Sequence, residues 1–163
     1  MLHPTKNDLP EASREKLVDL LNLQLAHAID MGLQAKHAHW NVRGPGFIAL
    51  HELFDKVSAA VQEGIDVLAE RCIQLGGTAH GTIQMLNKTS VLKPYPTTIV
   101  NGTEHVKALS RALAQYGKGL RHAIEAADKL EDKVSADIFT ELARATDKYL
   151  WFVEVHLEGA DKD

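Results

Sequence analysis

Cysteine is almost absent from this chain, since Cys72 is the only one among its 163 residues. A single cysteine excludes an intrachain disulfide framework and is typical of a reducing compartment, so the expected location is the cytoplasm. Long apolar runs are also missing, and we therefore expect neither a secretory signal nor a transmembrane helix. The chain has no basic excess, because its formal net charge is -4, and this argues against a surface that binds nucleic acid strongly.

The sequence does contain helical periodicity within an ordinary apolar content. Hydrophobic residues make up 45% of the chain, enough for one domain with a sizeable core. A Gly-Pro-Gly segment at 44–46 breaks the pattern sharply, and a glycine pair at 76–77 ends the next apolar stretch. Asn101 followed by Glu104 resembles a capping box that starts another helix. We therefore expect four long helices, at about 11–40, 47–75, 102–130 and 134–157.

The segment between the second and third of these helices, 78–102, is much longer than an ordinary connection. Such a length predicts a crossover between two helical hairpins, and so an all-α four-helix bundle. The polar ends of the chain are expected to be short tails. The predicted organisation is an N-terminal tail, one domain and a C-terminal tail, with limits 1–10, 11–158 and 159–163.

Four side chains that can bind metals share one face of the second expected helix. His51 and Asp55 form one pair, and Asp66 and Glu70 form another, each with i,i+4 spacing. The two aspartates lie roughly 16 Å apart along the helix axis, too far for one ion or one close pair of ions. A second copy of the helix, packed antiparallel, brings the first pair of one chain against the second pair of its partner. The spacing thus predicts two identical sites per dimer.

The midpoint of this face is expected to allow a close approach, because Ala59, Ala60 and Gly64 are small and the two-fold axis would lie near Ala60. His39 can join the His51 pair when the Gly-Pro-Gly turn folds the first helix back beside the second. Mixed imidazole and carboxylate ligands suit iron, zinc or manganese better than calcium or magnesium. From spacing alone, surface salt-bridge positions remain an equal alternative to a metal site.

Two known metal motifs can be compared with this pattern. The segment His51-Glu52-Leu53-Phe54-Asp55 differs from the helical zinc-protease motif in its last ligand, which makes a peptidase unsuitable. A di-iron site within one bundle needs Glu-x-x-His pairs, and no histidine here has a glutamate three positions before it. An interfacial site is the remaining di-iron option.

Several short segments of the chain match one known family. They are Ala-His-Trp-Asn-Val-Arg-Gly (38–44), Phe47, His51-Glu52, Asp55, Asp66, Ala-Glu-Arg (69–71), Leu-Gly-Gly (75–77) and Asp-Lys-Tyr-Leu-Trp-Phe (147–152). Together they cover nearly the whole chain and resemble the Dps family, the mini-ferritins named as DNA-binding proteins from starved cells. The resemblance implies a ferritin-like four-helix bundle with one long crossover carrying a short extra helix. It also implies a homo-oligomer, a hollow dodecamer built from two-fold dimers.

The resemblance places the family's intersubunit ferroxidase ligands at His39, His51, Asp55, Asp66 and Glu70. It implies an enzyme that oxidises ferrous iron at di-iron sites, with hydrogen peroxide or dioxygen as the oxidant. The ferric iron is then stored inside the shell, which protects against oxidative damage.

Further positions follow from the same resemblance or depart from it. Trp40 matches a tryptophan beside the site that intercepts radicals, with simple packing as its other possible role. Asp137 matches an acidic residue of the three-fold pores through which iron passes, although it could equally be a solvated helix residue. His80 stands where the family more often has an apolar residue and could be an extra nitrogen ligand that favours zinc at this site. His156 is a weaker candidate of the same kind.

DNA binding is expected to be weak or absent. Family members that condense DNA often use lysine-rich tails, whereas residues 1–10 contain only Lys6 and the chain ends Glu-Gly-Ala-Asp-Lys-Asp. A charge of -4 per chain, repeated over a shell, repels phosphate backbones. Two alternatives stay open: a nucleoid-binding shell with little ferroxidase activity, and a metal store whose site holds zinc.

Overall fold

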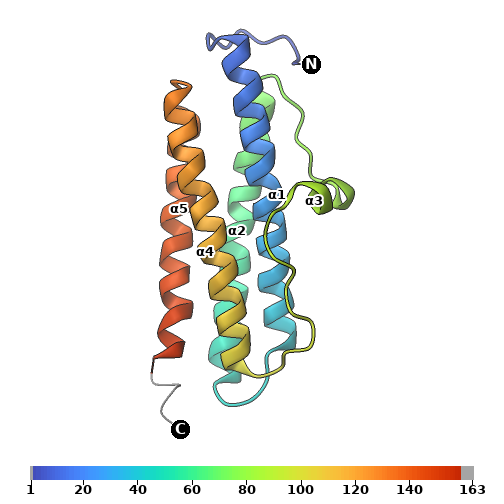
Figure 1. Cartoon of the computed structure of the whole chain (residues 1–163), viewed down its shortest axis with the longest axis vertical. Helices are drawn as coiled ribbons and strands as arrows, with labels where there is room; N and C mark the ends of the chain where they lie inside the picture. The colour runs from blue at the N-terminus through green and yellow to red at the C-terminus, as the bar shows by residue number, and fades with distance from the viewer. Residues whose placement is uncertain (1, 159–163) are drawn as a thin grey trace.

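The computed structural model describes residues 2–158, which form a bundle of long helices (Figure 1). No β-strand occurs within this range, so the expected all-α class is confirmed. Each long helix begins and ends within a few residues of its expected bounds, while the expected C-terminal tail, 159–163, lies outside the described residues. The elements are α1 (Glu11–Asn41), α2 (Phe47–Gln74), α3 (Ile83–Thr89), α4 (Gly102–Lys129), α5 (Lys133–Glu154) and a final 3-10 turn (Val155–Leu157).

Two helical hairpins make up the bundle, α1 with α2 and α4 with α5. The turn between α1 and α2 depends on left-handed glycines, since Gly44 has φ 95° and Gly46 has φ 74°. The crossover runs beside α1 and carries α3 against it (Figure 1), which confirms the expected short extra helix. The resulting order places the end of α1 and the start of α2 side by side.

Hydrogen bonds fix the crossover to α1. The Ser90 hydroxyl donates to the Asp30 carboxylate at 2.5 Å. The Gln34 amide donates to Asp30 at 3.0 Å and to the backbone carbonyl of Lys93 at 3.1 Å. Because Asp30 and Gln34 lie one turn apart on α1, they hold the crossover at two points, and residues just after Lys93 are placed accurately against the bundle.

Side-chain caps mark the N-terminal ends of α4 and α5, the two helices of the second hairpin. The Asn101 carboxamide oxygen accepts from the backbone N–H of Glu104 at 2.9 Å, which confirms the expected cap. The turn between α4 and α5 has a signal that the apolar pattern did not reveal. The Asp132 carboxylate accepts from the backbone N–H groups of Val134 at 3.1 Å and Ser135 at 3.3 Å, and so starts α5.

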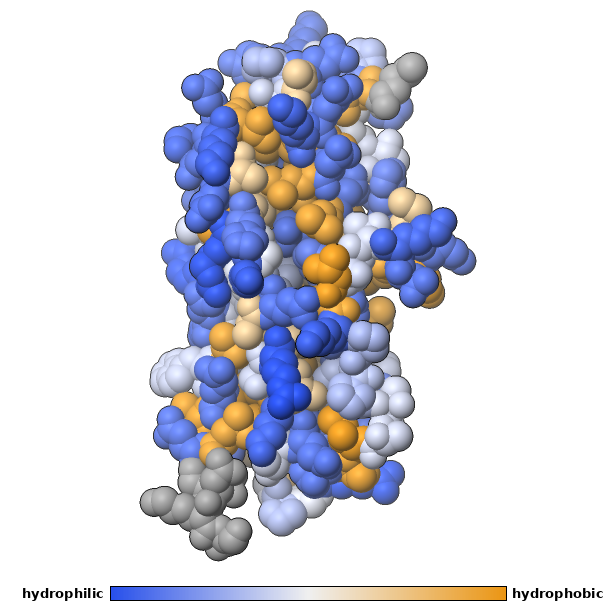
Figure 2. Space-filling model, viewed as in Figure 1, coloured by the Kyte–Doolittle hydropathy of each residue, from blue (hydrophilic) through white to orange (hydrophobic). Residues whose placement is uncertain are grey.

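The N-terminal segment packs on the end of α2. The backbone N–H of His3 donates to the carbonyl of Gly76 at 2.7 Å, and Leu2 and Leu9 contact the apolar core. Lys6 stays exposed. The face viewed in Figure 2 is mostly hydrophilic, with apolar side chains visible between the helices. No helix among residues 2–158 combines the length and the apolar character that a membrane span requires.

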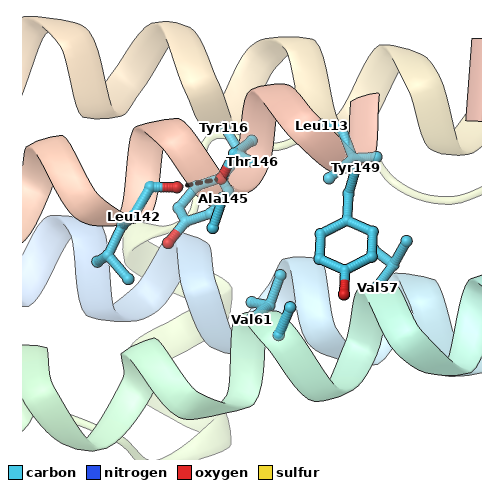
Figure 3. Close-up of a pocket in the computed structure, with 9 residues that line it drawn as sticks. Val57, Val61, Leu113, Tyr116, Leu142, Ala145, Thr146 and Tyr149 are labelled. Carbon is cyan, nitrogen blue, oxygen red and sulfur yellow. Dashed lines mark hydrogen bonds between the residues drawn. The ribbon is translucent and has the colours of Figure 1, made fainter. Parts of the chain in front are cut away.

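A small cavity lies between α2, α4 and α5 (Figure 3). Its walls are apolar apart from Tyr116, Tyr149 and Thr146, whose hydroxyl donates to the carbonyl of Leu142 at 2.7 Å. Two of the chain's three tyrosines therefore border the same cavity.

Candidate metal centre

His39 and His51 form a stacked pair across the α1–α2 turn, with ring centroids 3.7 Å apart. The Nδ1 atom of His39 lies 2.7 Å from the carbonyl oxygen of His51, and the Nδ1 atom of His51 lies 2.8 Å from the carbonyl oxygen of His39. A carbonyl oxygen only accepts hydrogen bonds, so each Nδ1 carries the proton. In a neutral ring the second nitrogen, Nε2, is then the one able to bind a metal.

The reciprocal bonds exist because of the local chain geometry. His39 lies in the last turn of α1 and His51 in the second turn of α2, with the left-handed glycines between them. The ring of Phe47 lies 5.0 Å from that of His51 and limits its rotation. Both histidines are therefore held by backbone and ring contacts of their own subunit.

Asp55, one turn after His51, lies near the two imidazoles and also has a basic partner. Its carboxylate forms an ion pair with Lys36, which comes from α1. The hydrogen bond from Lys36 is the main cause that lowers the pKa of Asp55. Lys36 lies three residues before His39, so both side chains point to the same side of α1. The charge of the first pair is thus already compensated within one subunit.

Asp66 and Glu70 are exposed on α2, and neither takes part in an ion pair within residues 2–158. In that same range no cluster of three or more His, Cys, Asp or Glu side chains is arranged to hold a metal ion. One subunit therefore brings together His39 and His51, keeps Asp55 beside Lys36, and leaves the two acidic residues apart.

The spacing along α2 suits a two-fold arrangement. The midpoint between positions 51 and 70 coincides with that between 55 and 66, just after Ala60. The small residues there do not all serve this face, however. Gly64 is buried, and a Cβ added to it would meet the side chain of Leu142 at 2.5 Å, so this glycine serves the contact with α5. Ala60 also lines a pocket against α5, and only Ala59 is exposed.

The other predicted positions are spread over the molecule. Trp40 is 68% exposed beside His39. Asp137 is exposed on α5, with no ion pair to any described residue. His80 borders a surface pocket with Glu15 and Asp19 of α1. It follows the C-terminal end of α2, whereas His51 lies near the N-terminal end of that helix. His156 borders a different pocket, with Leu50 and Glu104.

Sequence reasoning overlooked two features near the site. Lys36 could have been found from its i,i+3 spacing to His39, but its pairing with Asp55 depends on how α1 meets α2. Tyr95 and His105 were overlooked as well, because they come from the crossover and from α4 and meet only in the folded chain. No periodic signal marks such a contact.

The helical arrangement agrees with comparisons against known proteins. The matching family model is the ferritin-like domain, over residues 18–162. The DNA protection during starvation protein of Agrobacterium fabrum (strain C58) is 44% identical over 156 residues, which cover 96% of each chain. The tetragonal form of Mycobacterium smegmatis Dps has a TM-score of 0.91 at 34% identity, covering 96% of each chain. Dps from Microbacterium arborescens in the high iron form has a TM-score of 0.84 at 29% identity, covering 94% of this chain and 98% of that one.

Two helical hairpins joined by a long crossover that carries a short helix form a ferritin-like bundle. The relative and the two structures named above are Dps or starvation-protection proteins and match over nearly their whole length. The family can therefore be given more specifically than as ferritin-like. The chain belongs to the Dps family of ferritin-like proteins.

Proposed function

We propose that this protein is a mini-ferritin that oxidises ferrous iron at sites shared between two subunits. The observation that carries the proposal is the reciprocal histidine pair. His39 and His51 each bond the other's backbone through Nδ1, which directs the remaining nitrogen of each ring to a ligand. In the antiparallel dimer, Asp66 and Glu70 of the partner subunit supply negative charge opposite these nitrogens and Asp55.

The reaction treats iron as the substrate. Two ferrous ions give one electron each to hydrogen peroxide, which takes up two protons and leaves as two molecules of water. Dioxygen is the alternative oxidant. The imidazoles hold the ions in place, and the carboxylates balance the added charge as each ion becomes ferric. Lys36 pairs with only one oxygen of Asp55, so the other oxygen stays available to an ion, and the ammonium competes with that ion for the charge of the carboxylate.

The ferric product is stored in a hollow shell in the cytoplasm, a dodecamer built from six of these dimers. The Dps of Microbacterium arborescens, solved in a high iron form, supports iron loading of this fold. Asp137 attracts incoming ferrous ions at the shell pores, and Trp40 protects the site from stray radicals. The name of the Agrobacterium relative supports a protective role. We assign that role to iron removal rather than DNA binding, because the N-terminal segment packs on α2 and carries a single lysine.

The first test is ferrous oxidation by purified, metal-stripped protein, with peroxide and dioxygen compared side by side. We expect oxidation well above the protein-free rate, with iron retained by the shell. A rate equal to that of the protein-free control contradicts the ferroxidase assignment and leaves the zinc-filled store as the next candidate, to be examined by zinc titration.

A second test asks whether the site is shared. His51→Ala and Asp66→Asn should each abolish rapid oxidation while the shell stays assembled. Co-expression of the two variants restores one intact site in each mixed dimer, because both changes fall in the same composite site. We expect about a quarter of the wild-type rate for random pairing. A site contained in one subunit gives no recovery on mixing.

A further inference from the structure

A half-buried tyrosine and a fully buried histidine form a hydrogen-bonded pair between the crossover and α4. The hydroxyl of Tyr95 lies 2.9 Å from Nδ1 of His105, which is a good hydrogen-bond distance. His105 is fully buried, and its Nε2 atom has no partner among the described residues. His27 of α1 has an Nε2 atom in the same state, so the hydrogen bond to a tyrosine is what distinguishes His105.

One aromatic contact links this pair to the last turns of α1, where the candidate metal centre lies. The ring of His37 lies 5.3 Å from that of Tyr95, edge to face. His37 lies on α1 three residues before Trp40, and side chains at this spacing are neighbours on one helix face. Trp40 is 68% exposed and directly follows His39. His37 therefore links the end of α1, where His39 and Trp40 lie, to Tyr95 and His105.

We propose that Tyr95 and His105 act as an internal electron donor that repairs Trp40 after its oxidation beside the metal site, an inference that rests on the proposed function. Tyr95 gives one electron to the oxidised indole while its phenolic proton moves to Nδ1 of His105. Tyr95 becomes a neutral phenoxyl radical, His105 becomes an imidazolium, and Trp40 returns to its reduced form. The oxidising equivalent is thereby moved from the exposed Trp40 to the half-buried Tyr95, whose hydroxyl is paired with the buried His105.

The oxidant is the hydroxyl radical, formed when only one ferrous ion meets hydrogen peroxide. That ion becomes ferric and the peroxide yields a hydroxide ion and a hydroxyl radical. The radical takes one electron from Trp40 and becomes a second hydroxide. After the transfer from Tyr95, a later ferrous ion supplies an electron to the phenoxyl radical, and the proton returns from His105. The sum is two ferrous ions oxidised per peroxide, as in the main reaction, with no damaged side chain.

The local environment supports this proton transfer. Burial raises the pKa of Tyr95, so the phenol stays protonated and cannot lose an electron without losing its proton. Burial lowers the pKa of His105, and the charge of His37 acts in the same direction, so the ring is neutral and can accept the proton. At 2.9 Å the acceptor is already within the range required for direct transfer.

The other two tyrosines lack this arrangement. Tyr116 and Tyr149 border the apolar cavity between α2, α4 and α5 (Figure 3), and neither hydroxyl hydrogen-bonds to a histidine or carboxylate among residues 2–158. Trp151, the only other tryptophan, is 61% exposed near the end of α5. These residues provide matched controls within the same chain.

The test is freeze-quench electron paramagnetic resonance of the assembled shell, mixed with peroxide and less ferrous iron than is needed for two ions per site. Ring-deuterated tyrosine identifies the radical, because deuteration narrows a tyrosyl signal and leaves a tryptophan signal unchanged. We expect a tyrosyl signal in the wild type, its loss in Tyr95→Phe, and its retention in Tyr116→Phe. In Tyr95→Phe a tryptophan signal should accumulate instead, together with oxidised Trp40 in peptide mass spectra.

His105→Asn separates proton acceptance from hydrogen bonding. The asparagine amide can still bond the hydroxyl of Tyr95 but is too weak a base to take its proton. We expect the tyrosyl yield to fall severalfold while the folded shell and the rate of ferrous oxidation remain as in the wild type. Unchanged yield in His105→Asn, or an unchanged tyrosyl signal in Tyr95→Phe, overturns the proposal.

A metal-free experiment distinguishes failure of this inference from failure of the proposed function. Azide radicals made by pulse radiolysis oxidise exposed tryptophan in protein that contains no iron. We expect the tryptophan radical to decay as a tyrosyl radical grows in the wild type and in Trp151→Phe, and this transfer to be lost in Tyr95→Phe and Trp40→Phe. If transfer occurs but iron oxidation does not, only the ferroxidase assignment fails. If iron is oxidised rapidly but no transfer occurs, the repair role fails.

Discussion

The two metal-binding pairs on α2 differ in how much of their geometry one subunit fixes. Around His51, ring stacking, backbone carbonyls and Lys36 set the position of every donor. Around Asp66 and Glu70, exposed carboxylates have no charged partner among residues 2–158. The comparison suggests that the two pairs have different roles. The imidazoles, whose direction matters for binding, are oriented within one subunit before assembly. The negative charge of Asp66 and Glu70 stays uncompensated until the partner subunit and a metal ion are present.

The end of α2 that carries Asp66 and Glu70 is nevertheless held firmly against the rest of the bundle. Arg71, next to Glu70, is buried and donates to both carboxylate oxygens of Asp132 at 3.0 Å and to the hydroxyl of Ser135 at 3.1 Å. Burial alone raises the pKa of Asp132, but hydrogen bonds from Ser135 and Arg71 outweigh it and lower the pKa overall. This ion pair, in which Nη2 of Arg71 reaches both oxygens of Asp132, fastens the end of α2 to the start of α5. The exposed carboxylates thus project from a rigid helix.

The largest effect on stability should come from removing the charge of Asp132. In Asp132→Asn, Arg71 keeps its buried charge without a counter-ion, and we expect a loss of about 3 to 5 kcal/mol. Denaturant unfolding at fixed protein concentration measures it. Asp147→Asn is the matched control, because its pair with Arg121 is half-exposed and should contribute at most about 1 kcal/mol. Equal losses in both variants contradict the proposed anchor.

Much of the fold could be predicted from sequence, because helix periodicity and the glycine and asparagine signals are local. The positions of His51, Asp55, Asp66 and Glu70 on α2 could be predicted for the same reason. The assignment of Gly64 to the two-fold contact was wrong, since in sequence a small residue near the axis resembles one that faces a neighbouring helix, and only the contact with Leu142 distinguishes them. The Lys36–Asp55 pair depends on how two helices meet, which spacing within one helix does not specify.

Two histidines, His27 and His105, are buried in the bundle, whereas His39 and His51 of the candidate metal centre are partly exposed. Burial lowers the pKa of His27 and of His105 below the ordinary value of 6.5. As the pH falls below about 6.5, the unfolded chain binds protons that the folded chain does not, so stability falls with pH until the folded-state pKa is reached. We expect a slope of up to about 1.4 kcal/mol per pH unit for each histidine in that window.

Thermal unfolding between neutral and mildly acidic pH checks this sign. His27→Gln should reduce the slope, whereas His122→Gln, at an exposed position on α4, should not change it. A stability that rises toward acid would show that the buried rings are held in their charged form.

A smaller effect should follow from freeing Asp55. In Lys36→Met the carboxylate loses its ammonium partner, and a divalent cation no longer competes with it. The pair is 37% and 50% exposed, so its contribution is about 1 kcal/mol or less, and zinc affinity should rise by roughly fivefold at most. Titration calorimetry of metal-stripped shells measures the change, with the exposed Lys56→Met as control. Weaker binding would mean that Lys36 orients Asp55 for the metal.

The smallest effect on metal binding is expected from substituting His80. This substitution tests whether His80 belongs to the same site as Asp66 and Glu70. The side chain borders a pocket with Glu15 and Asp19 of α1, and its backbone N–H donates to the Asn22 side chain at 2.8 Å. That placement favours a role at the surface of its own subunit over one as an extra ligand. We therefore expect zinc inhibition of ferrous oxidation to be the same in His80→Ala as in the wild type. A clear loss of zinc inhibition would place His80 in the shared site. Asp66 and Glu70 would then share that site with an imidazole that no hydrogen bond among residues 2–158 of its own subunit fixes in place.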